Sequence, residues 1–209
     1  MRISEMFESI QGEGPLTGTR AIFIRTSGCN LSCPWCDTKY AWSDANYMDL
    51  TIDQILDYIN RSPGIKHIVI TGGEPTVQMD DLQQLVYQLK EYGRHVTLET
   101  NGVEKPTDEL FAKLDLIMVS PKSLAVADEW LQDAVEKKNV EIKFVVGPQE
   151  IKLIPEWIRS KGLIGVYLMP MGTGIDELIT GSHAIMAAML EYHLDCIICP
   201  RVHLFLGVK

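Results

Sequence analysis

Short apolar strands alternate with amphipathic helices along almost the whole chain, and this alternation constrains the fold more than any other feature. Six runs rich in Val, Ile and other apolar residues predict strands at 21–26, 67–71, 95–99, 116–120, 140–146 and 165–169. Strands that alternate with helices pair in parallel through right-handed crossovers, and apolar strands indicate a sheet covered on both faces. The sequence therefore predicts an α/β fold, either an open doubly wound sheet or a partial (β/α) barrel.

Helices are predicted between these strands from the 3.6-residue spacing of apolar positions. They span 51–61, 80–92, 107–113, 127–137, 149–159 and 175–192. Thr51 and Gln54 form a capping-box pattern, and Gly93 is a stop signal. The helix at 149–159 is expected to be interrupted near Pro155, because proline removes a backbone donor.

A cysteine pair near the end of the chain belongs to one more predicted short strand, 196–199. Alternation along a strand points Cys196 and Cys199 to opposite faces. We therefore interpret both as ordinary buried cysteines, while their spacing leaves a contribution to a zinc site as the alternative.

An unusual loop follows each of the six predicted strands. These loops begin at Cys29 and at residues 72, 100, 120, 148 and 170. Ligands of parallel α/β sheets and barrels bind at the carboxyl ends of the strands. The six loops are therefore expected to converge on one rim and to form a single site there.

The loop after the first predicted strand carries three cysteines within eight residues, Cys29, Cys33 and Cys36. Three thiolates hold a metal centre but leave one coordination position open. Structural zinc sites usually need a second close pair of ligands, so an iron–sulfur cluster fits better. The iron that lacks a cysteine is then free to bind the amino and carboxylate groups of S-adenosylmethionine, a source of radical chemistry.

Length and charge exclude several other classes of protein. The chain has 209 residues, which predicts one domain over 1–209, and its formal net charge of −9 argues against a nucleic-acid surface. No apolar run reaches the ~18 residues of a membrane helix, and the N-terminus has no signal-peptide pattern. We expect a cytoplasmic protein, where clustered thiols stay reduced.

The cysteine motif with Trp35 before its third cysteine, together with the run from Gly72 to Pro75, resembles the radical S-adenosylmethionine superfamily. The resemblance implies a partial (β/α)6 barrel with parallel strands and an extra C-terminal segment. It also implies a [4Fe-4S] cluster on the three cysteines. The residues implied to bind S-adenosylmethionine are Trp35, Cys36, Asp37, Gly72, Gly73, Glu74, Glu99, Asn101, Ser120, Pro121 and Lys122.

Further motifs are similar to those of the 7-carboxy-7-deazaguanine synthase family. They cover 5–14, 23–25, 36–38, 71–75, 99–102, 120–122 and 200–203. This resemblance implies radical ring contraction of 6-carboxy-5,6,7,8-tetrahydropterin to 7-carboxy-7-deazaguanine with loss of ammonia, in queuosine or other deazapurine biosynthesis. A radical activase of a glycyl-radical enzyme and a non-enzymatic zinc-binding module are the alternatives.

The family resemblance also suggests which side chains meet the pterin. The expected substrate residues are Ile10, Gln11, Gly12, Glu13, Arg25, Thr71 and His203. Arg25 offers a planar fork for the substrate carboxylate, and Thr38 offers a hydroxyl to Mg²⁺. Each has a simpler alternative: Arg25 as a strand-end ion pair, Thr38 as a turn cap and His203 as a structural side chain. No protein group is expected to be catalytic beyond the cofactor-derived radical.

Two positions depart from the family pattern. Met169 stands where some members have glutamine, and Leu204 follows His203 where members often have lysine. The hydrogen bond and the positive charge of those members are therefore not expected here. The resemblance further implies a homodimer and an electron donor such as flavodoxin or ferredoxin.

Overall fold

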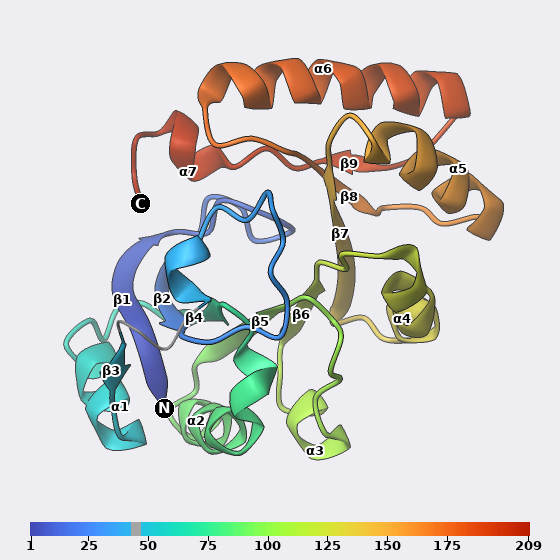
Figure 1. Ribbon diagram of the computed structural model, residues 1–209. Coiled ribbons are helices and arrows are strands. Elements are labelled where there is room, and N and C mark those ends of the chain that lie inside the picture. The colour runs from blue at the N-terminus through green and yellow to red at the C-terminus, as the bar shows by residue number, and fades with distance from the viewer. Residues whose placement is uncertain (43–46) are drawn as a thin grey trace.

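One curved sheet of nine strands runs through the part of the chain that this computed structural model describes, residues 1–42 and 47–209. Its order is β3-β1-β2-β4-β5-β6-β7-β8-β9. The strands are β1 (Arg2–Ile10), β2 (Arg20–Thr26), β3 (Met48–Asp49), β4 (His67–Gly72), β5 (His95–Thr100), β6 (Leu116–Val119), β7 (Val140–Val146), β8 (Tyr167–Pro170) and β9 (Ile197–Ile198). Within the described residues β3 and β9 are edges that do not meet, so the structure is an unclosed barrel, as predicted (Figure 1).

The predicted parallel pairing is confirmed from β2 through β9. The N-terminal strand β1 is an addition that the apolar pattern does not predict, and it pairs antiparallel with β2. Its sequence alternates poorly because it is only half-buried and carries charges. Glu5 and Glu8 of β1 pair across the sheet with Arg25 and Arg20 of β2, at 2.8 and 2.9 Å. Cross-strand ion pairs thus replace part of the apolar burial that marks the other strands.

The helices follow the strands in the predicted order. They are α1 (Ile52–Asn60), α2 (Met79–Glu91), α3 (Asp108–Phe111), α4 (Leu124–Glu136), α5 (Glu150–Lys161), α6 (Ile175–Tyr192) and α7 (Val202–Phe205), with 3₁₀ turns η1 (Lys39–Ala41) and η2 (Pro75–Gln78). Thr51 caps α1 with the predicted capping box. Helix α3 is shorter than predicted, and α4 begins earlier because Ser123 caps it.

The predicted interruption of the helix at Pro155 is wrong. Helix α5 runs continuously from 150 to 161 with Pro155 inside it. Ile154, Trp157 and Ile158 of this helix are buried in one apolar cluster with Phe144 of β7. This burial outweighs the one backbone hydrogen bond that proline cannot donate.

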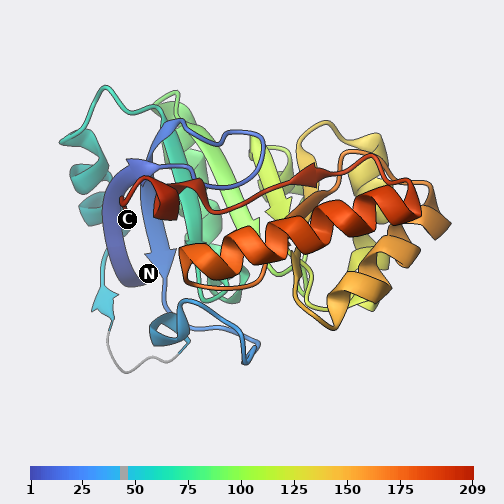
Figure 2. The ribbon, with the colours of Figure 1, turned by 90° about the horizontal axis from the view of Figure 1, so that it is seen from above.

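Two large apolar clusters hold the helices to the outer face of the sheet. One joins α1, α2 and α3 to strands from β2 to β6, and the other joins α4, α5 and α6 to β7 and β8. Figures 1 and 2 show α5 and α6 together at the β8–β9 end of the sheet. No helix in the described residues is long and apolar enough to cross a membrane.

The segment after β9 extends from one end of the sheet to the other. Helix α7 lies close to β1, as Figures 1 and 2 both show, and the Val202 amide donates to the Gly12 carbonyl at 3.0 Å. The side chain of Lys209 contacts Glu5 of β1. The predicted extra C-terminal segment therefore lies across the gap that the strands leave open.

Candidate active site

Polar side chains gather in a cleft at the carboxyl ends of the parallel strands, which holds about 1270 Å³ of space, part of it open to solvent. The loops after β2, β4, β5 and β6 line it as predicted. Those after β7 and β8 do not, and these strands contribute Lys143, Val145 and Met169 instead. The predicted site residues in its lining are Ile10, Gln11, Gly12, Glu13, Arg25, Cys29, Cys33, Trp35, Cys36, Asp37, Thr38, Thr71, Gly72, Gly73, Glu74, Glu99, Asn101, Ser120, Lys122 and His203. Pro121 is buried and lines a smaller neighbouring cavity.

The three cysteines lie on the loop between β2 and η1 and all face the cleft as free thiols. Hydrogen bonds already orient two of the sulfur atoms. Cys29 Sγ accepts from the Leu31 amide at 3.4 Å, and Cys36 Sγ accepts from Trp42 Nε1 at 3.2 Å. Burial raises the pKa of the Cys29 and Cys33 thiols. Thiolate ligation in this loop therefore depends on a bound metal centre to displace the protons.

The donor set fits a cluster better than a single ion. Within residues 1–42 and 47–209, no three His, Cys, Asp or Glu side chains converge on a point where one metal ion would sit. Each cysteine of a four-iron cluster binds a different iron, so its sulfurs need not converge in that way. A second cysteine pair is also absent from this rim, because Cys199 is buried against Gly14 and Cys196 packs into the apolar cluster under α6.

Two glycines let the end of β4 approach the cysteine loop closely. Gly72 has a φ of 142°, and a Cβ there would lie 2.4 Å from the Thr26 backbone. A Cβ on Gly73 would lie 2.1 Å from the Gly28 carbonyl oxygen. No other residue fits either position, so the backbone of this turn is held open toward the cleft.

Glu74, the next residue, is an internal support. Its carboxylate accepts from Thr100 Oγ1 at 2.8 Å, from the Asn101 amide at 2.6 Å and from the Thr76 amide at 3.1 Å. Burial raises the pKa of Glu74, against the opposing effect of these hydrogen bonds. Asn101 continues the link by donating from Nδ2 to Asn30 of the cysteine loop at 2.7 Å. The ends of β4 and β5 and the cysteine loop are thus fixed to one another.

Glu99 lies with the residues expected to bind substrate rather than with Asn101. Its Oε1 accepts from Gln11 Nε2 at 3.0 Å, and its Oε2 accepts from Thr71 Oγ1 at 2.9 Å. Gln11 in turn accepts from the Glu13 amide at 3.2 Å, so the turn after β1 is held against β4 and β5. This placement differs from the sequence-based grouping, which put Glu99 among the S-adenosylmethionine residues.

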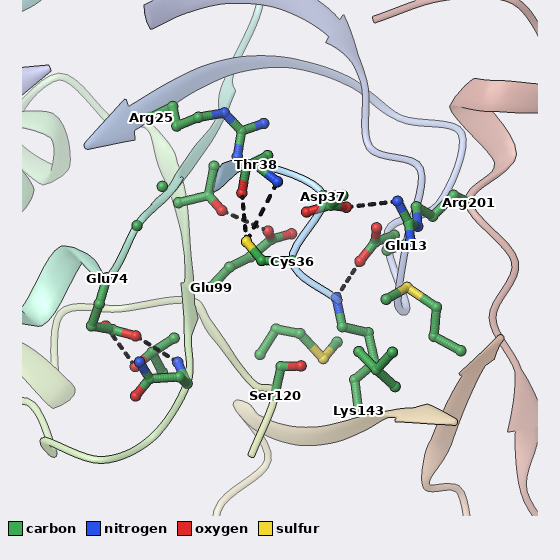
Figure 3. A pocket seen from close by; sticks show the side chains of 18 of the residues that line it. Glu13, Arg25, Cys36, Asp37, Thr38, Glu74, Glu99, Ser120, Lys143 and Arg201 are labelled. Carbon is green, nitrogen blue, oxygen red and sulfur yellow. Dashed lines mark hydrogen bonds and ion pairs between the residues drawn. The ribbon is translucent and has the colours of Figure 1, made fainter. Parts of the chain in front are cut away.

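Arg25 combines the two interpretations that the sequence left open. Its Nε donates to Glu5 Oε1 at 2.8 Å, so it is an ion pair. Its terminal nitrogens face the cleft (Figure 3). Glu5 also accepts from Tyr40 Oη at 2.8 Å. Burial opposes the charge of Arg25, but Tyr40 and Glu5 outweigh it and raise the pKa.

Lys122 is a partly buried lysine on the cysteine side of the cleft. Its Nζ donates to the carbonyl and the hydroxyl oxygen of Ser120, both at 2.8 Å. Burial lowers the pKa of Lys122, with the positive charge of Lys143 acting in the same direction. The two neighbouring cations make this wall a favourable place for an anionic group.

Two more predicted site residues, His203 and Thr38, lie against the turn after β1 and the cysteine loop, respectively. The ring of His203 lies against Gly12, where an added Cβ would be 1.9 Å from Nδ1. Burial lowers the pKa of His203, which favours the neutral ring. Thr38 donates its amide to Cys36 Sγ at 3.4 Å and its hydroxyl lies 3.5 Å from the same sulfur, but its side chain makes no hydrogen bond that caps η1. The Thr38 side chain also lines the cleft (Figure 3).

Sequence reasoning missed two charged residues of the cleft, Lys143 and Arg201. Lys143 of β7 forms an ion pair with Glu13. Arg201 donates from Nη1 to Asp37 Oδ2 and from Nη2 to the Gly172 carbonyl, both at 2.6 Å. A signal existed for each. Lys143 interrupts an apolar strand, and Arg201 stands inside the quoted motif 200–203 without a role.

Comparisons with known proteins cover almost the whole chain. The family profile described as the radical SAM superfamily matches residues 23–177. A 7-carboxy-7-deazaguanine synthase from Hyperthermus butylicus is 36% identical and aligns with 98% of this chain and 92% of its own. One from Rhodopirellula baltica is 39% identical over 84% of this chain and 75% of its own.

A solved structure has the same architecture. It is described as QueE from Escherichia coli and is 28% identical, with a TM-score of 0.70. The match covers 94% of this chain and 92% of that chain. The two structures therefore share their overall architecture over nearly their full lengths.

Proposed function

Since this chain belongs to the 7-carboxy-7-deazaguanine synthase family of the radical SAM superfamily, we propose that it converts 6-carboxy-5,6,7,8-tetrahydropterin to 7-carboxy-7-deazaguanine. The reaction is a radical ring contraction that releases ammonia, and its product enters queuosine or another deazapurine pathway. One observation carries the proposal: a single cleft brings the three-cysteine loop opposite the Gln11, Glu13 and Arg25 side chains. A glycyl-radical activase or a zinc module has no use for that second group of residues.

Cys29, Cys33 and Cys36 would hold a [4Fe-4S] cluster in this proposal. With S-adenosylmethionine bound, the cluster supplies a carbon-centred radical that removes a hydrogen atom from the substrate. The chain's own task is to hold the reactants in place and exclude water, since a primary carbon radical attacks almost any nearby C–H bond. Trp35 lines the cleft and is exposed to solvent.

S-adenosylmethionine would lie along the cysteine side of the cleft. The open backbone of Gly72 and Gly73 suits its methionine amino group, and Lys122 with Ser120 suits a carboxylate. Glu74 and Asn101 keep this wall in position. Glu74 accepts the Asn101 amide, and the Asn101 side chain donates to Asn30 of the cysteine loop.

The pterin would lie between the turn after β1 and the ends of β4 and β5. Gln11, Glu13 and Thr71 offer acceptors and donors for its heterocyclic edge, with Ile10, Gly12 and His203 around it. Arg25 would bind the substrate carboxylate with its terminal nitrogens. Glu99 belongs with this group, because it shares hydrogen bonds with both Gln11 and Thr71.

Three further properties extend the proposal. Thr38 would offer its hydroxyl to a Mg²⁺ ion, which prefers hard oxygen ligands. A reduced flavodoxin or ferredoxin would supply the electron, and the thiol ligands suit the reducing cytoplasm. The whole span 1–209 would act as one domain.

We further propose a homodimer, for which β9 offers a sheet edge that no strand of residues 1–42 and 47–209 covers. Ile197 of β9 and Met186 and Leu190 of the neighbouring α6 are exposed there. Size-exclusion chromatography with light scattering tests this point, and a monomer across micromolar concentrations would refute it.

The decisive experiment is turnover by the anaerobically reconstituted, reduced protein. Incubation with S-adenosylmethionine and the carboxypterin should yield 7-carboxy-7-deazaguanine, identified by mass, and free ammonia. Omission of S-adenosylmethionine is the control. Loss of the pterin without that product, or no reaction by protein that carries an intact cluster, would contradict the proposal.

A further inference from the structure

A lysine lies inside the barrel, next to the carboxylate of the turn after β1. Lys143 extends from the middle of β7 to Glu13, and Figure 3 shows the two charged ends meeting across the cleft. Only 6% of the Lys143 side chain and 15% of the Glu13 side chain are exposed. The two residues are 130 positions apart in the chain. The pair therefore forms only when β7 and the N-terminal turn are assembled in the folded barrel.

The contact uses one oxygen of Glu13 and leaves the other free. Lys143 Nζ donates to Oε2, while Oε1 has no hydrogen-bond donor among the side chains and amides of residues 1–42 and 47–209. The Glu13 amide donates to Gln11 Oε1, which fixes the backbone of the turn. The carboxylate is thus held in one orientation, with acceptor capacity directed to the cleft that it lines.

The charges around Glu13 come from several elements. The residues whose charges act on the pKa of Glu13 are Lys143 of β7 and Arg201 and His203 at α7. The charge of Glu13 in turn acts on the pKa of Lys122 after β6 and of Cys199 after β9. Burial on its own would raise the pKa of Glu13, but Lys143 has the largest opposing effect and the pKa is lowered. The pKa of Lys143 is raised, so both members of the pair are ionised.

Stability alone is a weak reason for this arrangement. Replacing a buried ion pair by apolar residues is often neutral or stabilising, because desolvation of two charges costs so much. Apolar side chains such as Met118 and Val145 line the same cleft, so an apolar residue at position 143 would not be out of place there. A buried pair whose carboxylate keeps a free oxygen toward a cavity suggests a role in ligand recognition instead.

We propose that Lys143 is a positioning residue that keeps Glu13 ionised and oriented. With Glu13 in that state, the cleft selects heterocycles that present two adjacent N–H donors, such as the 2-amino-4-oxo edge of a pterin, over their 2,4-dioxo analogues. This inference rests on the function proposed above. It concerns how the pterin is told apart from a lumazine, whose 2-oxo group replaces the 2-amino group.

The chemistry of the two ligand edges explains the selection. The 2-amino group and N3–H of a pterin are both donors, and a carboxylate accepts both at once. A lumazine has a 2-oxo group in place of the 2-amino donor. Its carbonyl oxygen would face an oxygen of the Glu13 carboxylate, and two acceptors repel each other. A protonated Glu13 would lose one acceptor and so lose most of this discrimination.

The test compares binding of 6-carboxypterin and 6-carboxylumazine to the reconstituted protein by equilibrium dialysis. The wild type should prefer the pterin by about 10- to 100-fold, the ratio expected for one charge-assisted hydrogen bond. Lys143→Met should reduce the preference at neutral pH to about threefold or less. The preference should return as the pH rises, because Glu13 then loses its proton without help. The titration stays below the pH at which the N3–H of the pterin itself ionises, since that donor is part of the recognised edge.

Matched variants separate charge from folding. Lys143→Arg should restore the preference at neutral pH, and Glu13→Gln should lack it at every pH. The double variant should resemble Glu13→Gln and show no recovery at high pH, which excludes titration of Lys122 or His203 as the cause. Lys161→Met removes a surface lysine paired with Asp128 at 2.7 Å and should leave the preference unchanged.

The outcomes distinguish this inference from the proposed function. A wild type that binds neither ligand contradicts the proposed function. A wild type that turns over the carboxytetrahydropterin but binds pterin and lumazine equally overturns the inference alone. The inference is also overturned if Lys143→Met keeps the wild-type preference for the pterin at neutral pH. It is likewise overturned if Lys143→Met loses that preference at every pH and Lys143→Arg does not restore it.

Discussion

The two walls of the cleft are built in different ways. The cysteine wall consists of short contiguous motifs, in which Cys29, Cys33 and Cys36 share one loop and Gly72 to Glu74 share one turn. The opposite wall consists of contacts between distant segments, such as Glu13 with Lys143 and Gln11 with Glu99. The first wall is specified by local backbone and spacing, and the second by assembly of the barrel. The predictions below test this difference, from the largest effect to the smallest.

Loss of one cysteine should abolish the function of the first wall. Cys29→Ala leaves the cluster underligated, so we expect no detectable turnover under strict anaerobiosis. Iron and sulfide content per chain, with the visible absorption of the reconstituted protein, measures the cause directly. Cys196→Ala is the matched control and should retain the cluster and its activity. Wild-type turnover by Cys29→Ala would refute the assignment of the loop.

The close approach of β4 to the cysteine loop should not tolerate a side chain. Gly72→Ala places a Cβ 2.4 Å from the Thr26 backbone at a φ of 142°, and we expect a loss of about 2–4 kcal/mol in the free energy of unfolding. Gly18→Ala is the control, because Gly18 also has a positive φ of 89° but nothing within 4 Å of its Cβ position. Its cost should be about 1 kcal/mol. If urea titrations give equal losses in the free energy of unfolding for the two variants, the positive φ, and not the close approach to Thr26, accounts for the cost.

On the second wall, Arg25→Ala should separate the two ligands. We expect pterin affinity to fall by about 10- to 100-fold, because charge-assisted hydrogen bonds to the carboxylate are lost. Affinity for S-adenosylmethionine should change by less than about threefold. Arg20→Ala removes an arginine of the same strand, which pairs with Glu8 at the surface, and should change neither affinity. Equal weakening of both ligands by Arg25→Ala would contradict its place on the substrate side.

A change away from both walls should affect stability alone. Thr51→Ala removes the side-chain oxygen that accepts from the Gln54 amide at 3.2 Å at the start of α1. The free energy of unfolding should fall by about 1 kcal/mol, with unchanged pterin binding. Thr51→Ser keeps the cap and should retain most of that stability. A clear loss of binding in Thr51→Ala would show that α1 communicates with the cleft.

Features that depend on neighbouring residues were the ones that sequence reasoning predicted well. The capping box of α1, the bounds of α6 and the parallel pairing of the strands follow from apolar spacing and local hydrogen bonds. The choice of an unclosed barrel over an open doubly wound sheet came from the family resemblance. The errors arose where packing overrides local preference. Pro155 stays inside α5 because the helix buries an apolar face. Strand β1 forms because its backbone pairs with β2, with Ile3 buried and Phe7 stacked on Phe23.

The sequence by itself determined the α/β class, the cysteine loop and the family, because thiol spacing and strand–helix alternation are recorded within short stretches of chain. Only the tertiary structure decided that Lys143 pairs with Glu13, that Arg201 holds Asp37 and that Glu99 joins Gln11 and Thr71. These contacts link residues that are between 28 and 164 positions apart. Spacing in the chain says nothing about such partners, because the barrel's curvature and register choose which side chains meet inside it.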